Sequence, residues 1–171
     1  EIPSTNTIIN LNNEFMIVGS NSWNSVAYGN GIFVVGGSEG YVTTSTDEGK
    51  TWSTPKQLVT IGSWSNVIYA NGSFMMLNFH NGKLATSTDG TIWTIGDTYS
   101  LSYWRGLAYG NGIYVAVGPS NGIMMTSPDG KTWTKRTVGS MTWKDIAYGN
   151  GIFIAIADGY FVTSTDGITW T

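Results

Sequence analysis

Residues 23–52 have the sequence WNSVAYGNGIFVVGGSEGYVTTSTDEGKTW, and closely similar sequences recur three more times in this chain of 171 residues. The eight tryptophans mark the repeat, because they form two interleaved series in which neighbours lie 37 to 41 residues apart. The first series is Trp23, Trp64, Trp104 and Trp143, and the second is Trp52, Trp93, Trp133 and Trp170. A fixed period near 40 residues predicts a repeat architecture.

Each copy predicts four short strands joined by tight turns. In the first copy the stretches 23–28, 32–35, 41–45 and 57–60 have strand length and no helical periodicity. Asn30-Gly31 separates the first two stretches, and Asn-Gly is a strong hairpin signal because both central positions of a type I′ turn need a positive φ. Equivalent Asn-Gly pairs stand at 71–72, 111–112 and 150–151. Four-stranded meanders of about 40 residues are the blades of β-propellers.

The predicted fold is therefore all-β, a β-propeller of four four-stranded blades in a single domain, residues 1–171. The repeats are 23–63, 64–103, 104–142 and 143–171, and the fourth ends at Thr171, before its fourth strand. The sequence of residues 14–22 resembles the sequence before Trp143. We therefore expect the N-terminal segment 1–22 to supply the missing fourth strand of the last blade and so to close the ring. It would pair with residues 161–164 and cover an edge that is otherwise prone to aggregation. The alternatives are a part of a larger propeller and a ring made from two chains.

Composition excludes several classes of function. The net charge is −3 and only 11% of the residues are charged, so the electrostatic footprint of a nucleic-acid binder is missing. The chain has no cysteine and one histidine, His80, which leaves thiolate chemistry, His-based triads and zinc sites without their usual groups. We expect no cofactor and no metal site. No stretch approaches the roughly 18 apolar residues of a membrane span.

The turn before each tryptophan of the second series repeats one pattern, Ser-x-Asp-Gly-x-x-Trp, which we call the box. It closely resembles the Asp-box, or BNR repeat, of sialidase-like β-propellers, and the whole unit is similar to repeats in bacterial surface proteins and phage tail-associated proteins. The resemblance implies a structural turn away from any active centre, in which Asp and Ser oxygens accept backbone N–H bonds. The first copy departs by the inserted Glu48, and the second by Ile92 where Thr is usual. The box residues are Ser45, Asp47, Gly49 and Trp52; Ser87, Asp89, Gly90 and Trp93; Ser127, Asp129, Gly130 and Trp133; and Ser164, Asp166, Gly167 and Trp170.

The same resemblance raises the question of enzyme activity. Sialidases of this family bind the substrate carboxylate with three arginines, and this chain has only Arg105 and Arg136. We therefore expect no enzyme and no catalytic residue. A glycoside hydrolase with another carboxylate pair is a distant third function, for which Glu39 and Asp158 lie in equivalent loops. The plainer interpretation, which we adopt, makes both acids solvated loop residues.

The four copies differ mainly in the loops between their second and third strands and in the connections between copies, such as 78–82 and 99–103. In an up-and-down meander these segments share one rim, so we expect a recognition face there. Flat rings with short hydrogen-bonding groups suit carbohydrate or protein recognition. An alternative for the first tryptophan series is packing between blades. The expected binding residues are Trp23, Asn24, Trp64, His80, Asn81, Trp104, Arg105, Asn121, Trp143 and Lys144.

The expected function is a non-enzymatic recognition module, lectin-like or receptor-binding, whose partner is a glycan or a cell-surface receptor. The alternative is a structural or assembly module that packs against sister chains of a fibre, tail or surface complex. The abundance of Ser, Thr, Asn and Gly favours an extracellular or virion-surface location.

Overall fold

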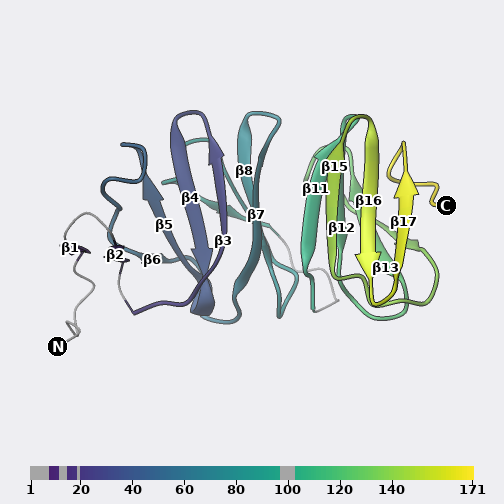
Figure 1. Ribbon diagram of the computed structural model, residues 1–171, viewed down its shortest axis with the longest axis horizontal. Helices are drawn as coiled ribbons and strands as arrows, with labels where there is room; N and C mark the ends of the chain where they lie inside the picture. Colours follow the sequence, from purple (N-terminus) through teal and green to yellow (C-terminus); the bar gives the residue numbers. More distant parts are fainter. Residues whose placement is uncertain (1–7, 12–14, 19, 97–102) are drawn as a thin grey trace. The chain divides into compact units, whose positions relative to one another are not determined.

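The computed structural model describes residues 8–11, 15–18, 20–96 and 103–171. Its strands form four repeated antiparallel sheets, called blades 1 to 4, and a separate hairpin (Figure 1). The chain divides into two compact units. The first comprises Glu1–Asn78 and Leu84–Ile95, and the second Phe79–Lys83 and Gly96–Thr171.

The first unit contains blades 1 and 2. In both, each strand pairs with its neighbours in sequence, which is the meander of a propeller blade. The last strand of blade 1 is shorter than the predicted stretch 57–60, since only Lys56 and Gln57 pair with the strand before them. Blade 1 consists of β3 (Trp23–Gly29), β4 (Ile32–Gly37), β5 (Tyr41–Ser45) and β6 (Lys56–Gln57), with a 3-10 turn at Ser38–Gly40. Blade 2 consists of β7 (Trp64–Ala70), β8 (Ser73–Asn78), β9 (Leu84–Ser87) and β10 (Thr94–Ile95).

The second unit contains blades 3 and 4. Blade 3 consists of β11 (Gly106–Gly110), β12 (Ile113–Val117), β13 (Ile123–Ser127) and β14 (Thr134–Thr137). Blade 4 has three strands, β15 (Asp145–Gly149), β16 (Ile152–Ala157) and β17 (Tyr160–Ser164). Beside β17, the backbone N–H of Thr163 donates to the carbonyl of Thr171 (2.8 Å), and the reverse bond is 3.0 Å. Thr171 thus holds the position at which β14 begins in blade 3.

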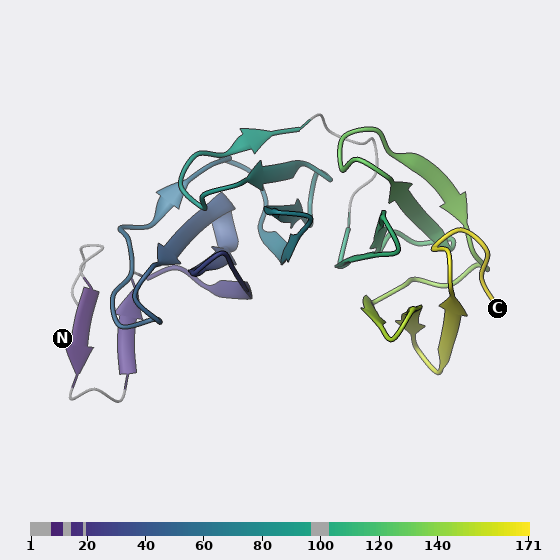
Figure 2. The ribbon, with the colours of Figure 1, turned by 90° about the horizontal axis from the view of Figure 1, so that it is seen from above.

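The N-terminal segment forms a hairpin. Strands β1 (Ile8–Leu11) and β2 (Phe15–Val18) pair antiparallel, with Ile8 opposite Val18 (Figure 2). The structure pairs β2 with β1, where we expected residues 14–22 to pair with residues 161–164; residues 14 and 19 lie outside the described part. A hairpin closes over a three-residue connection, which costs less chain entropy than pairing with a distant segment.

The Asn-Gly turns adopt the left-handed backbone conformation that the sequence predicts. In blade 1, Asn30 has φ 50° and Gly31 has φ 79°. The three equivalent pairs have asparagine φ values of 46° to 51° and glycine φ values of 75° to 83°. Asparagine tolerates this region better than most residues, so each hairpin sets its own register locally.

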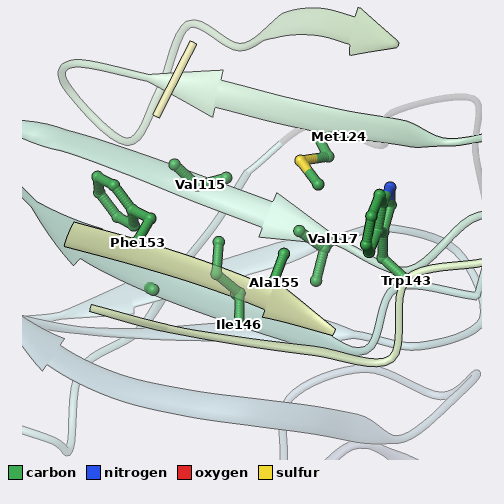
Figure 3. Packing of buried hydrophobic residues seen from close by; sticks show 8 residues of the cluster. Val115, Val117, Met124, Trp143, Ile146, Phe153 and Ala155 are labelled. Carbon is green, nitrogen blue, oxygen red and sulfur yellow. The ribbon is translucent and has the colours of Figure 1, made fainter. Parts of the chain in front are cut away.

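Each unit encloses an apolar core between its two blades. A single sheet cannot cover its own faces, so two packed layers are the smallest arrangement with an interior. The first core consists of Val34, Val42, Trp64, Val67, Phe74, Met76 and Ala85. The second consists of Ala108, Val115, Val117, Met124, Trp143, Ile146, Phe153 and Ala155 (Figure 3).

Candidate functional site

The box turns are held by a repeated set of hydrogen bonds. In blade 2 the Ser87 hydroxyl donates to Asp89 Oδ1 (3.0 Å) and accepts the Gly90 N–H (2.8 Å). Asp89 Oδ1 also accepts the N–H groups of the two residues after Gly90, both at 2.8 Å. Trp93 Nε1 donates to the Gly90 carbonyl (2.9 Å). The same bonds recur in blades 3 and 4, so the turn supplies partners for its own polar groups.

Blade 1 keeps this arrangement despite its inserted residue. Glu48 takes the extra place at φ 64°, and the Gly49 N–H still donates to Ser45 Oγ (2.9 Å). The Asp47 carboxylate accepts the N–H of Thr51 (2.8 Å) and its hydroxyl (2.5 Å). The insertion lengthens the turn and leaves its carboxylate engaged.

Hydrogen bonding lowers the pKa of all four box aspartates from 3.8 to about 2. In Asp89, Asp129 and Asp166 the largest cause is donation by backbone N–H groups, and in Asp47 it is donation by the Thr51 hydroxyl. Donors to the charged form favour that form. A carboxylate with so low a pKa is a poor general acid or base near neutral pH, so these groups suit a turn better than a reaction.

Three of the four tryptophans expected at the centre of the recognition face are buried. Trp64 is 0% exposed, and Trp104 and Trp143 are each 1% exposed. Trp64 and Trp143 belong to the cores between blades, as in the alternative interpretation. Trp23 is half-buried, and both Trp23 and Trp143 donate Nε1–H to the carbonyl five residues earlier at 3.2 Å. A stacked sugar needs an accessible ring face, so the expectation of stacking on the three buried rings is wrong.

Two of the three asparagines of the expected face form hydrogen bonds with backbone groups. Asn24 is exposed, and its Nδ2 donates to the Trp64 carbonyl (3.3 Å) between blades 1 and 2. Asn81 Oδ1 accepts the Lys83 N–H (3.0 Å), which shapes its loop. Asn121 is exposed and has φ 65°, in the turn between β12 and β13.

Among the charged residues of the loops, Lys144 forms an ion pair with Asp158. Asp158 therefore has a cation as its partner within the second unit. Glu39, in the first unit, has φ 53°, and its carbonyl accepts Gln57 Nε2 (2.8 Å). The Asp158 carboxylate thus has a partner within its own unit, whereas the bond at Glu39 involves the backbone and not the carboxylate.

In the second unit, four side chains gather as the rim cluster: Phe79, His80, Tyr103 and Arg105. The Arg105 guanidinium carbon lies 5.4 Å from the centre of the Phe79 ring. The same ring meets His80 and Tyr103 edge-on, with centroid distances of 5.1 and 5.4 Å. Phe79 is half-buried and the other three are exposed, so one ring supports three accessible side chains.

Tyr103 has an unusual backbone conformation for its residue type. Its φ is 72° and it is 57% exposed, while its N–H donates to the Phe79 carbonyl. A positive φ is uncommon for residues other than glycine and costs of order 1 kcal/mol or more. The contact with Phe79 therefore holds Tyr103 in place. The rest of its connection, residues 99–102, lies outside the described part.

Phe79 and Tyr103 were not among the predicted binding residues, although His80 and Arg105 were. The sequence did carry a signal. Tyr103 stands directly before a first-series tryptophan, where the other copies have Ser22, Ser63 and Thr142. A large ring in place of a small polar residue marks a position that the repeat itself does not require.

A shallow pocket of about 270 Å³ lies at the box of blade 2. Its lining includes Ser73, Thr86, Thr88 and Asp89. The carboxylate already serves the turn. Within the described ranges, no group of three or more His, Asp or Glu side chains is placed to hold a metal ion. No helix in this part of the chain is long and apolar enough to cross a membrane.

Solved structures similar to this chain include propellers of low sequence identity. YCF48 bound to D1 peptide superposes with a TM-score of 0.68 and 20% identity, over 95% of this chain and 54% of that one. The Pan2 WD40 domain of Neurospora crassa has a TM-score of 0.72 and 11% identity, over 89% and 48%. The computationally designed Ika4 protein has a TM-score of 0.67 and 13% identity, over 85% and 91%. This chain thus spans about half the length of the YCF48 and Pan2 chains.

No curated protein matches the sequence. A family model described as the DUF6242 beta propeller domain matches residues 10–142. This match and the four repeated sheets confirm an all-β fold of propeller blades, four in number. The chain belongs to the DUF6242 β-propeller domain family.

Proposed function

We propose that the chain is a non-enzymatic recognition module that binds its partner through the rim cluster. The observation that carries this proposal is Tyr103, whose ring is exposed although its backbone is held at φ 72°. An unfavourable backbone conformation that leaves more than half of an aromatic ring in solvent costs the fold free energy, which the edge contact with Phe79 offsets only in part. Such local strain persists most often where it serves binding or catalysis.

The chemistry of the rim cluster suits a glycan. The apolar face of a sugar stacks on the Tyr103 ring, and its hydroxyl or carboxylate oxygens accept hydrogen bonds from Arg105. Within the described residues Arg105 forms no ion pair. Its guanidinium carbon lies over the Phe79 ring, and the guanidinium carries five N–H groups that can donate to a ligand.

The proposed partner is a glycan or a cell-surface receptor, met outside the cell or on a virion surface. The resemblance of the boxes to those of sialidase-like propellers supports this setting. We propose no catalytic role, because the two arginines lie in different parts of the second unit and do not form one site. Arg105 lies in the rim cluster, whereas Arg136 Nε donates to Thr126 Oγ1 (3.3 Å) inside blade 3.

The second candidate is an assembly module that binds a protein segment. YCF48, with a similar fold, is described bound to a peptide. Exposed rings beside a cation also suit a peptide with aromatic or acidic side chains. Sister chains of a larger surface complex would be the partners in that case.

The experiment is a screen of the purified chain against glycans and cell-wall polysaccharides, with calorimetry on each compound that binds. Two variants locate the site. Tyr103→Gly removes the ring and accepts a positive φ without strain, so it should fold normally and lose binding. Arg105→Gln should weaken binding about tenfold or more, since a charge-assisted hydrogen bond is lost.

The matched control is Lys50→Gln, which removes a cation whose side chain is 73% exposed in the box of blade 1. It should bind as wild type does. Absence of any glycan binding would overturn the lectin-like proposal in favour of the assembly module. Glycan binding that survives both Tyr103→Gly and Arg105→Gln would overturn the assignment to the rim cluster.

A further inference from the structure

Neighbouring blades within a unit meet through a tyrosine that lies over a glycine. In the first unit β7 packs against β3, and a Cβ placed on Gly29 would lie 1.9 Å from Cγ of Tyr69. In the second unit β15 packs against β11, and a Cβ on Gly110 would lie 2.3 Å from the Tyr148 ring. Both rings therefore occupy space that any residue larger than glycine would fill.

Aliphatic side chains complete the same contact. The box glycine of the later blade lies on a valine of the earlier one, since a Cβ on Gly90 would be 3.2 Å from Val34, and one on Gly167 2.9 Å from Val115. Within each unit, the earlier blade thus has a trailing face, which receives the later blade, and the later blade has a leading face, which packs on the earlier one. The trailing faces are Gly29, Val34 and Val42 in blade 1 and Gly110, Val115 and Met124 in blade 3. The leading faces are Val67, Tyr69 and Gly90 in blade 2 and Ile146, Tyr148 and Gly167 in blade 4.

Within the first unit, no described blade packs on the leading face of blade 1. Val26 is 59% exposed, whereas its equivalents Val67 and Ile146 are 4% and 6% exposed. Tyr28 is 60% exposed, and a Cβ on Gly49 would meet only a ring atom of Trp52 at 3.9 Å. These residues carry the knob of the contact and lack its socket.

The trailing face of blade 4 is also exposed, and in the part of the chain that the structure describes it lacks the tyrosine ring that covers the equivalent glycine in blades 1 and 3. Ile154 is 45% exposed where its equivalents Val34 and Val115 are fully buried, and Phe161 is 70% exposed. A Cβ on Gly149 would meet no atom of the described residues within 4 Å, although the equivalent glycines of blades 1 and 3 are covered by tyrosine rings. This face carries the socket of the contact and lacks its knob.

We propose that these two faces dock with a second copy of the chain. Tyr28 of one copy lies over Gly149 of the other, and Val26 packs against Ile154 and Phe161. The contact is head-to-tail, so a ring of two chains uses both open faces of each copy and closes.

A polar pair of the internal contact also has its counterpart at the open faces. Between blades 1 and 2, Ser25 Oγ accepts the Val67 N–H (3.0 Å). Asp145 holds the position of Ser25 in blade 4, and Val26 holds that of Val67 in blade 1. The Asp145 carboxylate, which already accepts the N–H of Ile146, is an acceptor for the Val26 N–H of the second copy.

The complementarity of the two open faces favours a second copy as the occupant, because one face carries the exposed Tyr28 ring and the other the uncovered Gly149. The second copy also brings both complementary faces at once. Large exposed apolar surfaces of this kind typically mark contacts with another protein surface.

Sedimentation velocity on the purified chain tests the stoichiometry. The expected species has twice the 18.5 kDa mass of one chain. Ile154→Asp and Val26→Asp should each raise the dissociation constant by roughly tenfold or more, because they place a charge in the contact. Gly149→Ala is the mild variant, since it blocks the tyrosine socket without touching the rest of its own chain. The control Ile92→Asp changes an exposed isoleucine of the blade 2 box and should leave the dimer intact.

Cross-linking distinguishes a second copy from closure within one chain. The chain has no native cysteine, so only the introduced cysteines can form a disulfide. Chains with Tyr28→Cys are mixed with chains carrying Gly149→Cys, and a disulfide-linked heterodimer is expected. Mixing Tyr28→Cys with Ile92→Cys is the control and should give no such product. A monomeric wild type, a disulfide formed only inside the double variant Tyr28→Cys/Gly149→Cys, or open-ended polymers would each overturn the two-chain ring.

Discussion

Replacing Gly110 by alanine tests how closely the blades of the second unit pack. The added Cβ would lie 2.3 Å from ring carbons of Tyr148, whereas ordinary carbon contacts are about 3.5–4.0 Å. The ring would have to withdraw by about 1.3 Å. It has little room to do so, because it also packs against Phe153, with ring centroids 4.6 Å apart, and Phe153 is fully buried.

The expected magnitude follows from two opposing effects. Overpacking a well-filled core costs about 1–3 kcal/mol. Where the native conformation allows it, replacing glycine by alanine stabilises a protein by about 0.4–1 kcal/mol, because it lowers the conformational entropy of the unfolded chain. The net loss should be about 1–2 kcal/mol, which for a domain of this size lowers the melting temperature by about 2–8 °C.

Urea denaturation followed by tryptophan fluorescence measures this change as a lower midpoint at an unchanged slope. The same substitution in a Tyr148→Ala background provides the control, since without the ring the new methyl group has space. There Gly110→Ala should be neutral or slightly stabilising. Wild-type stability of the single variant, or an equal loss in both backgrounds, would refute the account of the contact.

Three further outcomes are expected. The box aspartates have a pKa of about 2 in the folded chain and 3.8 ordinarily. Their contribution to the stability of the fold is therefore complete above pH 3.8 and is lost as the pH falls through 2. Asp166→Asn should reduce this pH dependence of the melting temperature in curves recorded from pH 5 to 2. Trp143→Phe should destabilise more than Trp64→Phe by roughly 1 kcal/mol in urea titrations, because Trp143 Nε1 has a hydrogen-bond partner and the buried Trp64 Nε1 has none in the described part of the chain. Phe153→Ala should cost about 3–5 kcal/mol by opening a cavity in the second core, and equal stability would contradict its burial.

The repeat and its turns could be predicted from the sequence because their signals are local. The Asn-Gly pairs require positive φ values wherever they occur, and the structure has them at all four places. The third strand of blade 1 matches its prediction, 41–45, residue for residue. The fourth strand does not, since a strand of two paired residues, both exposed, has no hydrophobic periodicity.

The rim cluster could not be predicted from the repeat pattern alone. Whether Trp64 faces a core or solvent is decided by how a neighbouring blade packs, and the strand pattern is the same in either case. The contact between Phe79 and Tyr103 joins the loop between β8 and β9 to the connection that leads from blade 2 to blade 3. Comparison of the copies with each other could locate the divergent rim, but only the fold brought these two rings together.

The order of strands within the sheets has a consequence for how the chain acquires its structure. In the described sheets every strand pairs with one that directly precedes or follows it in sequence, and each box completes its bonds within a single turn. Contacts so close in sequence form quickly and let a nascent chain order its hairpins as they emerge. Each core, however, takes side chains from two blades. The smallest cooperative folding step should therefore be a pair of blades, formed as soon as the second of the two has been synthesised.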